Sequence, residues 1–176
     1  LEQFAFSYDN RLNDSLPKEK FDYGHFTLFI PKSEFSDFLL WSDTIRTKIR
    51  SFAATDSVSG LSLTRMDTDF ELNSQNISLN HLDLKTSHSK IQGDLGFHFN
   101  DFGALGDFIN GVNFDFYLEE SVISQKDINF FADLPLNDFE AKVSGKIKGP
   151  VSRLALRDLI LDFGDNSRLV GNFDFM

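Results

Sequence analysis

The segment GVNFDFYLEES, residues 111–121, alternates apolar and polar side chains over most of its length. Val112, Phe114, Phe116 and Leu118 are the apolar members, and Asn, Asp and Tyr stand between them. Successive side chains of a β-strand point to opposite faces, so the pattern predicts a strand with one apolar and one polar face. Fold and function both depend on what that apolar face contacts.

The same alternation recurs through nearly the whole chain, with Asp, Asn, Ser, Lys and Thr at most of the intervening positions. One-sided burial of this kind is typical of antiparallel sheets. Turn-forming sequences rich in Gly, Asn, Asp and Ser separate the alternating segments. The sequence therefore predicts an all-β fold.

Three stretches depart from simple alternation. Residues 101–112 and residues 124–135 each predict a short helix, and in the second Ser124 and Asp127 have the spacing of a capping box. Residues 33–52 place apolar side chains at roughly helical spacing but also contain β-favouring residues. For this third stretch, the pattern supports helix and strand about equally.

The chain contains an internal repeat. Apolar residues follow the spacing 2, 3, 2 in residues 77–84 and again in residues 154–161. Each copy is followed by Ser, a base, an apolar residue, any residue, Gly, and Asp or Asn, in residues 89–97 and 167–175. The step of three predicts a bend or bulge in the strand. Repeated strand units indicate an architecture that extends by adding strands. Because the alternation runs to both ends, we expect residues 1–176 to be one segment of something longer.

Composition weighs against nucleic-acid binding and favours a dry surface. Asp plus Glu number 27 against 17 Lys plus Arg, a formal charge of −10, whereas phosphate binding needs clustered cations. There are 21 Phe against 3 Tyr and 1 Trp. Because Phe has no polar group, this excess favours a dry apolar surface over a protein-recognition hot spot. The absence of Cys excludes disulfides and thiolate metal sites.

No pattern in the sequence is typical of an enzyme. Glu119 and Glu120 are consecutive, so in a strand they point to opposite faces and cannot form a catalytic pair. The G-x-S-x-G, H-E-x-x-H and P-loop motifs are absent. Three of the four His residues fall in one hairpin-like region, where we expect solvated polar-face residues rather than metal ligands. We expect no catalytic residue, no metal and no cofactor.

The apolar faces can be buried in two ways. An apolar strand face ordinarily packs against a second sheet or helices, and a closed β-sandwich that binds a sugar or a protein stays open as an alternative. However, no strand is apolar on both faces, and only two short helices are predicted to cover a face. A single curved antiparallel, in part mixed, sheet with an open hydrophobic groove fits that inventory. The predicted groove-lining residues are Leu95, Phe97, Phe99, Val112, Phe114, Phe116, Leu118, Val143, Ile147, Leu161, Phe173 and Phe175.

Four segments carry a family resemblance, in this order along the chain. They are SDTIRTKIRSFAATDSVSGLSLTRM (42–66), ISLNHLDLKTSHSKIQGDL (77–95), LGDFINGVNFDFYLEESVISQKDINFFADLP (105–135) and VSGKIKGPVSRLALRDLILDFGDNSRLVGNFDF (143–175). Together they resemble the TamB-like proteins of the Bacteroidetes type, within the broader AsmA-like group. The ordered series carries the resemblance, since no single motif in it is specific.

The resemblance implies a fold, a location and a function. Such proteins are anchored in the inner membrane by one N-terminal helix and cross the periplasm as a bent β-sheet rod, or β-taco, with a hydrophobic groove inside. They are implicated in carrying phospholipid to the outer membrane. They are also implicated in outer-membrane protein assembly with a TamA-like partner of the Omp85 family, which would meet regions outside this chain. The expected ligands are therefore phospholipid acyl chains, and scaffolding of β-barrel assembly is the alternative. For residues 33–52 the resemblance favours strand.

Overall fold

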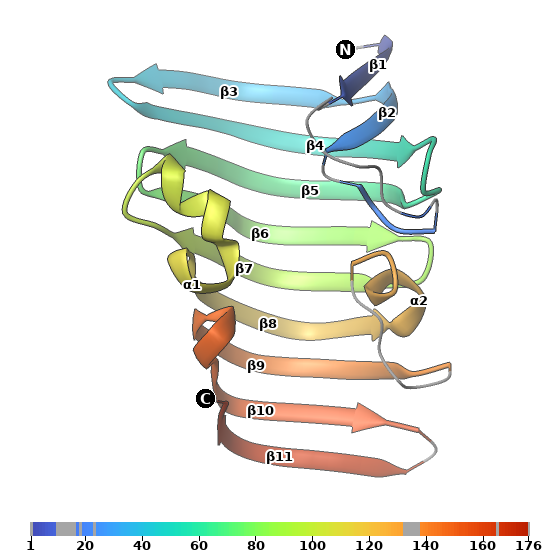
Figure 1. Cartoon of the computed structure of the whole chain (residues 1–176), viewed down its shortest axis with the longest axis vertical. Helices are drawn as coiled ribbons and strands as arrows, with labels where there is room; N and C mark the ends of the chain where they lie inside the picture. Colours follow the sequence, from blue (N-terminus) through green and yellow to red (C-terminus); the bar gives the residue numbers. More distant parts are fainter. Residues whose placement is uncertain are drawn as a thin grey trace.

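The computed structural model describes residues 2–9, 17, 19–22, 24–131, 138–164 and 166–175. Its strands form one sheet in the order β1-β2-β4-β5-β6-β7-β8-β9-β10-β11, and β3 pairs with β4 beside β2 (Figure 1). The strands are β1 (Glu2–Asp9), β2 (His25–Lys32), β3 (Glu34–Trp41), β4 (Thr44–Asp56), β5 (Ser62–Asn73), β6 (Asn76–Thr86), β7 (Lys90–His98), β8 (Asn113–Ser124), β9 (Glu140–Pro150), β10 (Ala155–Phe163) and β11 (Ser167–Asp174).

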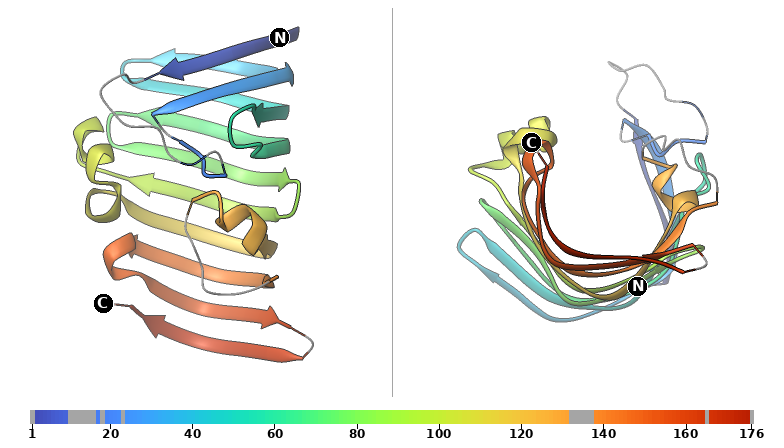
Figure 2. Two further views of the ribbon diagram at one scale, coloured as in Figure 1. Left: turned by 45° about the vertical axis from the view of Figure 1, so that its right-hand side comes forward. Right: turned by 90° about the horizontal axis from the view of Figure 1, so that it is seen from below.

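The sheet is bent across its strands into a U that is open along one side (Figure 2). All strand pairs in the described part of the chain are antiparallel, so the mixed pairing that we allowed for does not occur there. No second sheet covers the first among these residues, which rules out the closed sandwich for them. The predicted fold class, an open curved all-β sheet with short helices, is confirmed.

The helical segments are short and lie along the two rims of the U (Figure 1). Between β7 and β8, the 3-10 helix η1 (Phe102–Asp107) leads directly into α1 (Phe108–Gly111). On the opposite rim, α2 (Gln125–Ile128) follows β8. A further 3-10 turn, η2 (Val151–Arg153), joins β9 to β10 on the same rim as α1 (Figure 1). The ambiguous stretch near Trp41 forms β3 and β4, so the strand interpretation of residues 33–52 is confirmed.

The start of α2 is capped differently from the prediction. Ser124 does cap the helix, since its hydroxyl accepts a hydrogen bond from the backbone N–H of Lys126 at 3.3 Å. The Asp127 carboxylate, however, accepts from the Thr86 hydroxyl instead of the Ser124 N–H. That N–H donates to the Ser89 hydroxyl at 3.0 Å. The reciprocal capping box is therefore wrong, and the helix is tied to the β6–β7 turn. Residues 132–135, the end of the predicted helical stretch, lie outside the described residues.

A row of β-bulges crosses the sheet and makes the bend. In β6 the pairing with β7 advances three residues, from Leu79 to Leu82, while β7 advances only two, from Leu95 to Gly93. The same extra residue occurs in β4, β8 and β10, at Ile49/Phe52, Leu118/Ser121 and Leu156/Leu159. A bulge increases local twist and bends its strand. Because the bulges lie in neighbouring strands, their bends combine to fold the whole sheet.

The internal repeat corresponds to this row. Residues 77–97 form the β6–β7 hairpin and residues 154–175 lie at the β10–β11 hairpin. In the first hairpin the bulged residue His81 has φ of 52°, and its N–H donates to Asp94 Oδ1 at 2.7 Å. In the second, Asp158 also has φ of 52°, and its N–H donates to Asn172 Oδ1 at 2.8 Å. The Asp or Asn that the two copies share thus accepts a hydrogen bond from a backbone N–H that the bulge removes from the strand pairing.

A third copy of this device occurs in the β4–β5 hairpin, where the sequence gives no sign of it. Ser51 has φ of 54°, and its N–H donates to Asp67 Oδ1 at 2.7 Å. Met66 stands where the other two copies have Gly, so the Gly-Asp/Asn signature is missing. The bulge and its carboxylate or amide acceptor therefore occur in three hairpins, whereas the sequence signature marks only two of them.

Candidate functional site

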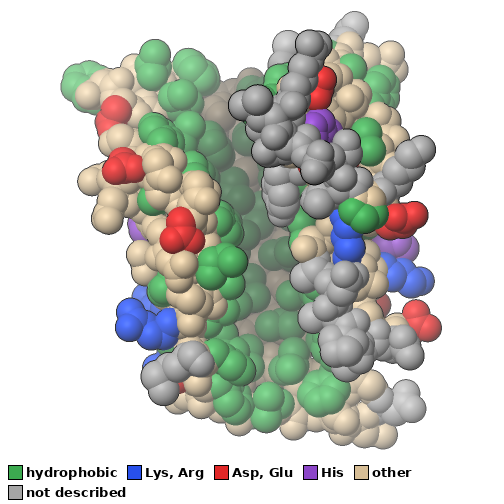
Figure 3. All heavy atoms as spheres, in the orientation of Figure 1, with side chains coloured by type: hydrophobic (Ala, Val, Ile, Leu, Met, Phe, Trp, Pro, Cys, Tyr) green, Lys and Arg blue, Asp and Glu red, His purple; other side chains and the backbone are tan. Residues whose placement is uncertain are grey.

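The inner face of the U is a continuous apolar surface, which we call the groove. Directly opposed residues in neighbouring strands point to the same face. One such row crosses eight strands. It begins at the buried Thr47 and continues through seven apolar residues: Phe70, Leu79, Leu95, Phe116, Ile147, Leu156 and Phe173. A second row lies beside it: Ile45, Leu72, Ile77, Phe97, Phe114 and Gly149. Figure 3 shows hydrophobic side chains lining the floor of a hollow between two walls.

Nine of the twelve predicted residues lie on this face. They are Leu95, Phe97, Phe114, Phe116, Leu118, Val143, Ile147, Leu161 and Phe173. All except Leu118 are partly exposed, and Leu118 is buried at the bend. Apolar side chains that remain partly exposed across a wide face are the property expected of a surface that receives an apolar ligand.

The other three predicted residues lie elsewhere. Val112 and Phe99 are buried at the η1–α1 rim, and the Phe99 ring packs on Phe102 with their centroids 5.7 Å apart. Phe175 follows β11 and is exposed, with its N–H donating to the Leu154 carbonyl at 2.9 Å. Their alternation in sequence is the same as that of the groove residues. It does not distinguish a position within a strand from one just beyond its end.

Several groove residues were not among the predicted ones, including Phe70, Ile77, Leu79 and Leu156. Each belongs to an alternating segment, and three of them belong to the 2, 3, 2 repeat. The alternation in the sequence was therefore sufficient to place these residues on an apolar strand face. It could not show how far along the sheet the groove continues, since that depends on which strands are neighbours.

Phenylalanine rings concentrate in the groove between β7 and β8. Phe97 lies 5.6 Å from Phe114 and 5.0 Å from Phe116, measured between ring centroids. Phe114 and Phe116 lie 4.5 Å apart with their planes at 14°. These spacings fall in the range of favourable aromatic contacts. The cluster therefore forms a firm apolar floor whose upper surface remains available.

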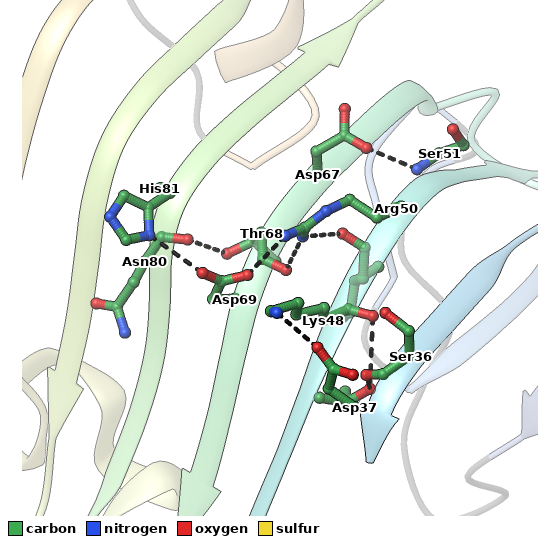
Figure 4. Close-up of polar contacts among 12 residues, drawn as sticks. Ser36, Asp37, Lys48, Arg50, Ser51, Asp67, Thr68, Asp69, Asn80 and His81 are labelled. Atoms are coloured by element: carbon green, nitrogen blue, oxygen red, sulfur yellow. Dashed lines mark hydrogen bonds and ion pairs between the residues drawn. The ribbon is translucent and has the colours of Figure 1, made fainter.

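The outer face carries the charged residues. Cross-strand ion pairs join Arg46 to Glu71 at 2.7 Å and Lys148 to Asp115 at 3.1 Å. Figure 4 shows how Arg50 links strands at the bulge row: its guanidinium contacts Asp69 Oδ1 at 2.7 Å and the Thr68 carbonyl at 2.8 Å. Such exposed pairs add little stability individually. Their main effect is to leave the two faces of the sheet chemically distinct.

Two carboxylates at the bulge row have altered acidity. The hydrogen bond from Arg50 lowers the pKa of Asp69, and a contact from His81 adds to the effect. Burial raises the pKa of Asp67, but hydrogen bonds from the Ser51 N–H and the Arg65 side chain outweigh it and leave that pKa below the ordinary value. Both pKa shifts favour the carboxylate form, in which Asp67 accepts from the Ser51 N–H and Asp69 contacts the Arg50 and His81 side chains.

A separate hollow lies on the outer face, apart from the groove. It has a volume of about 480 Å³ and lies over β7 to β11. Lys90, Lys142 and Arg168 line it together with Glu120 and Asp162. This mixture of opposite charges does not suit an apolar ligand. The groove, with its apolar lining, is therefore the candidate site for an apolar ligand.

Among the described residues, no cluster of three His, Asp or Glu side chains could hold a metal ion. None of the helices in the described ranges combines the length and the apolar character that a membrane span requires. A comparison of the chain with known proteins found no matching protein-family model, curated protein or solved structure.

Proposed function

We propose that this chain is a segment of a lipid-transfer protein, and that its groove shelters phospholipid acyl chains while they move along the sheet. The observation that carries the proposal is the apolar inner face, continuous over eight strands and left uncovered by polypeptide in the described part of the chain. By resemblance to the TamB-like proteins, the segment belongs to a periplasmic rod that carries phospholipid towards the outer membrane.

The physical properties of the groove suit a sliding ligand. Apolar contact is non-directional, so an acyl chain can move along the groove without breaking specific bonds. Each methylene group removed from water contributes about 0.8 kcal/mol, so partial sheltering of a tail is already substantial. Neighbouring strands stand about 4.8 Å apart, so eight strands give a path of roughly 34 Å. A lipid tail can therefore be sheltered over its full length.

A second candidate function rests on strand β3. All eight of its residues are exposed, including Phe38, Leu40 and Trp41 at 68%, 63% and 74%. Among the described residues, the strand pairs with β4 on one side only. An exposed apolar edge can pair with another strand. This favours a scaffold for outer-membrane β-barrel assembly, with an Omp85-type partner, as the alternative.

The test compares two substitutions on the same strand. Phe114→Glu places a charge in the groove, and we expect it to abolish phospholipid transfer between vesicles while the sheet stays folded. Tyr117→Glu makes the same chemical change on the outer face, where Tyr117 is 47% exposed, and should leave transfer unchanged. Circular dichroism and denaturation midpoints check the folding of both variants.

Photo-crosslinkers at Phe116 and at Asp115 identify the face that holds the lipid. Capture of phospholipid from Phe116 alone supports the groove. Capture from Asp115 alone would contradict lipid transfer in the groove. Capture of an unfolded barrel protein from β3, with no lipid at Phe116, would favour the scaffold instead.

A further inference from the structure

We propose that the η1–α1 rim is a side entrance to the groove, over which acyl chains pass directly from a bilayer surface. The inference rests on the proposed function and adds to it a partner, a lipid surface, and a place of contact. The η1–α1 rim comprises residues 102–111, including Phe102, Phe108 and Ile109. It stands at the end of one arm of the U (Figure 2).

The η1–α1 rim exposes apolar side chains that a short helix would normally bury. Neither η1 nor α1 contains a buried residue. Phe102, Phe108 and Ile109 are 53%, 44% and 57% exposed. Exposed apolar side chains gathered on one short segment indicate an interaction with another surface.

The η1–α1 rim is also a firm structure. The Asp101 carboxylate accepts a hydrogen bond from the Ala104 N–H at 3.2 Å at the start of η1. At its end, Gly111 lies so close to the preceding turn that a Cβ there would stand 2.6 Å from the Ala104 carbonyl oxygen. The segment therefore presents Phe102 and Ile109 from a compact turn.

A series of aromatic contacts joins the η1–α1 rim to the groove floor. The Phe108 ring lies 5.7 Å from Phe114 and 6.4 Å from Phe97, between centroids. Phe97 in turn contacts Phe116 at 5.0 Å. An acyl chain can therefore keep apolar contact from the outer surface of the rim to the floor. This continuity is why we assign the exposed patch to the same hydrocarbon ligand as the groove.

The charges nearby indicate the kind of bilayer. Asp101 and Asp107 are exposed at the two ends of η1, and residues 99–112 contain no Lys or Arg, while the exposed Arg153 of η2 lies beside α1 on the same rim. Two carboxylates and one guanidinium gain little from an anionic lipid surface, whereas the apolar side chains contact any bilayer. We therefore expect contact with zwitterionic phosphatidylcholine vesicles and slower extraction from vesicles rich in phosphatidylglycerol.

The experiment measures the rate at which the 176-residue chain extracts fluorescent phosphatidylcholine from phosphatidylcholine vesicles. Ile109→Glu should slow extraction about tenfold, since full burial of an isoleucine side chain in hydrocarbon is worth at least that factor. The matched control is Val58→Glu, an equally drastic change at a 45% exposed residue in the β4–β5 turn on the opposite rim (Figure 1). It should extract lipid at the unchanged rate.

A second readout separates this inference from the proposed function. Lipid delivered from detergent by dilution should fill the groove of Ile109→Glu to the wild-type level, measured by native mass spectrometry. Normal filling with unchanged extraction by Ile109→Glu overturns the side entrance and leaves the groove function standing. Capture of protein rather than lipid by a crosslinker at Ile109 also overturns it. Failure of the wild-type chain to take up lipid by either route overturns the proposed function, and the side entrance with it.

Discussion

At the scale of single residues, backbone crowding at the bend decides which side chains the sheet tolerates. Gly93 has φ of +131°, and a Cβ there would stand 1.9 Å from the Tyr117 carbonyl oxygen. Backbone atoms cannot yield as a flexible side chain can. We therefore expect Gly93→Ala to destabilise the chain by roughly 3 kcal/mol, at the upper end of ordinary point mutations.

Chemical denaturation at equilibrium measures this effect. Gly106→Ala is the matched control, because a Cβ at Gly106 would meet no atom within 4 Å. Its stability should change by less than about 1 kcal/mol. Equal stability changes in the two variants would mean that the backbone contact between β7 and β8 is not crowded.

The carboxylate of Asp94 gives a second prediction at this scale. It accepts a hydrogen bond from the His81 N–H, and Asn172 accepts the equivalent bond from Asp158 with its amide oxygen. An amide oxygen is therefore sufficient. We expect Asp94→Asn to be nearly neutral and Asp94→Ala to cost about 1 kcal/mol, the value of one lost hydrogen bond. Denaturation midpoints measure the stability of the two variants. An equal loss of stability in both would show that the negative charge of Asp94 matters.

At the scale of elements, the β4–β5 hairpin should be sensitive to acid. The pKa of Asp67 in the folded chain lies below its ordinary value of 3.8. Its stabilising contribution is therefore complete above about pH 4 and is lost as the pH falls through the lowered folded pKa. We expect amide exchange at Ser51 to become faster, relative to the intrinsic rate, as the pH falls below 4.

Asp67→Asn removes the titrating group and should remove this component of the acid response. Asp107→Asn, in exposed η1, is the matched control and should retain it. An acid response at Ser51 that persists in Asp67→Asn would place the cause at another carboxylate.

The strands and helices differ in how well the sequence predicted them. Period-two alternation predicted strands such as β8, because one face of each strand is apolar. The stretch around Trp41 remained ambiguous because β3 is exposed on both faces, so burial imposes no alternation there. The capping box at Ser124 failed because Thr86 and Ser89, distant in sequence, supply competing partners.

At the scale of the whole molecule, the open shape is visible in the surface area. The accessible surface is 11242 Å², whereas a compact monomer of 20.1 kDa has about 8,700 Å². The additional accessible surface arises because the sheet is a single layer, so neither of its faces is covered by a second one across the ranges that the structure describes. The sequence predicted an open sheet because it contains no strand that is apolar on both faces and no predicted helix long enough to form a second layer. It could not show that Val112 and Phe99 lie under the η1–α1 rim, because that depends on how a loop folds back.

The bulge row has a consequence for how such a chain can change in length. In β6–β7 and β10–β11 the first strand supplies the extra residue and the second supplies the Asp or Asn that satisfies it. Losing one strand would leave a donor without its acceptor and reverse the direction of the next strand. Losing both would leave the remainder in register. Insertions and deletions should therefore come in whole hairpins. The length of the sheet across its strands should then change in steps of about 9.6 Å, the spacing of two strands.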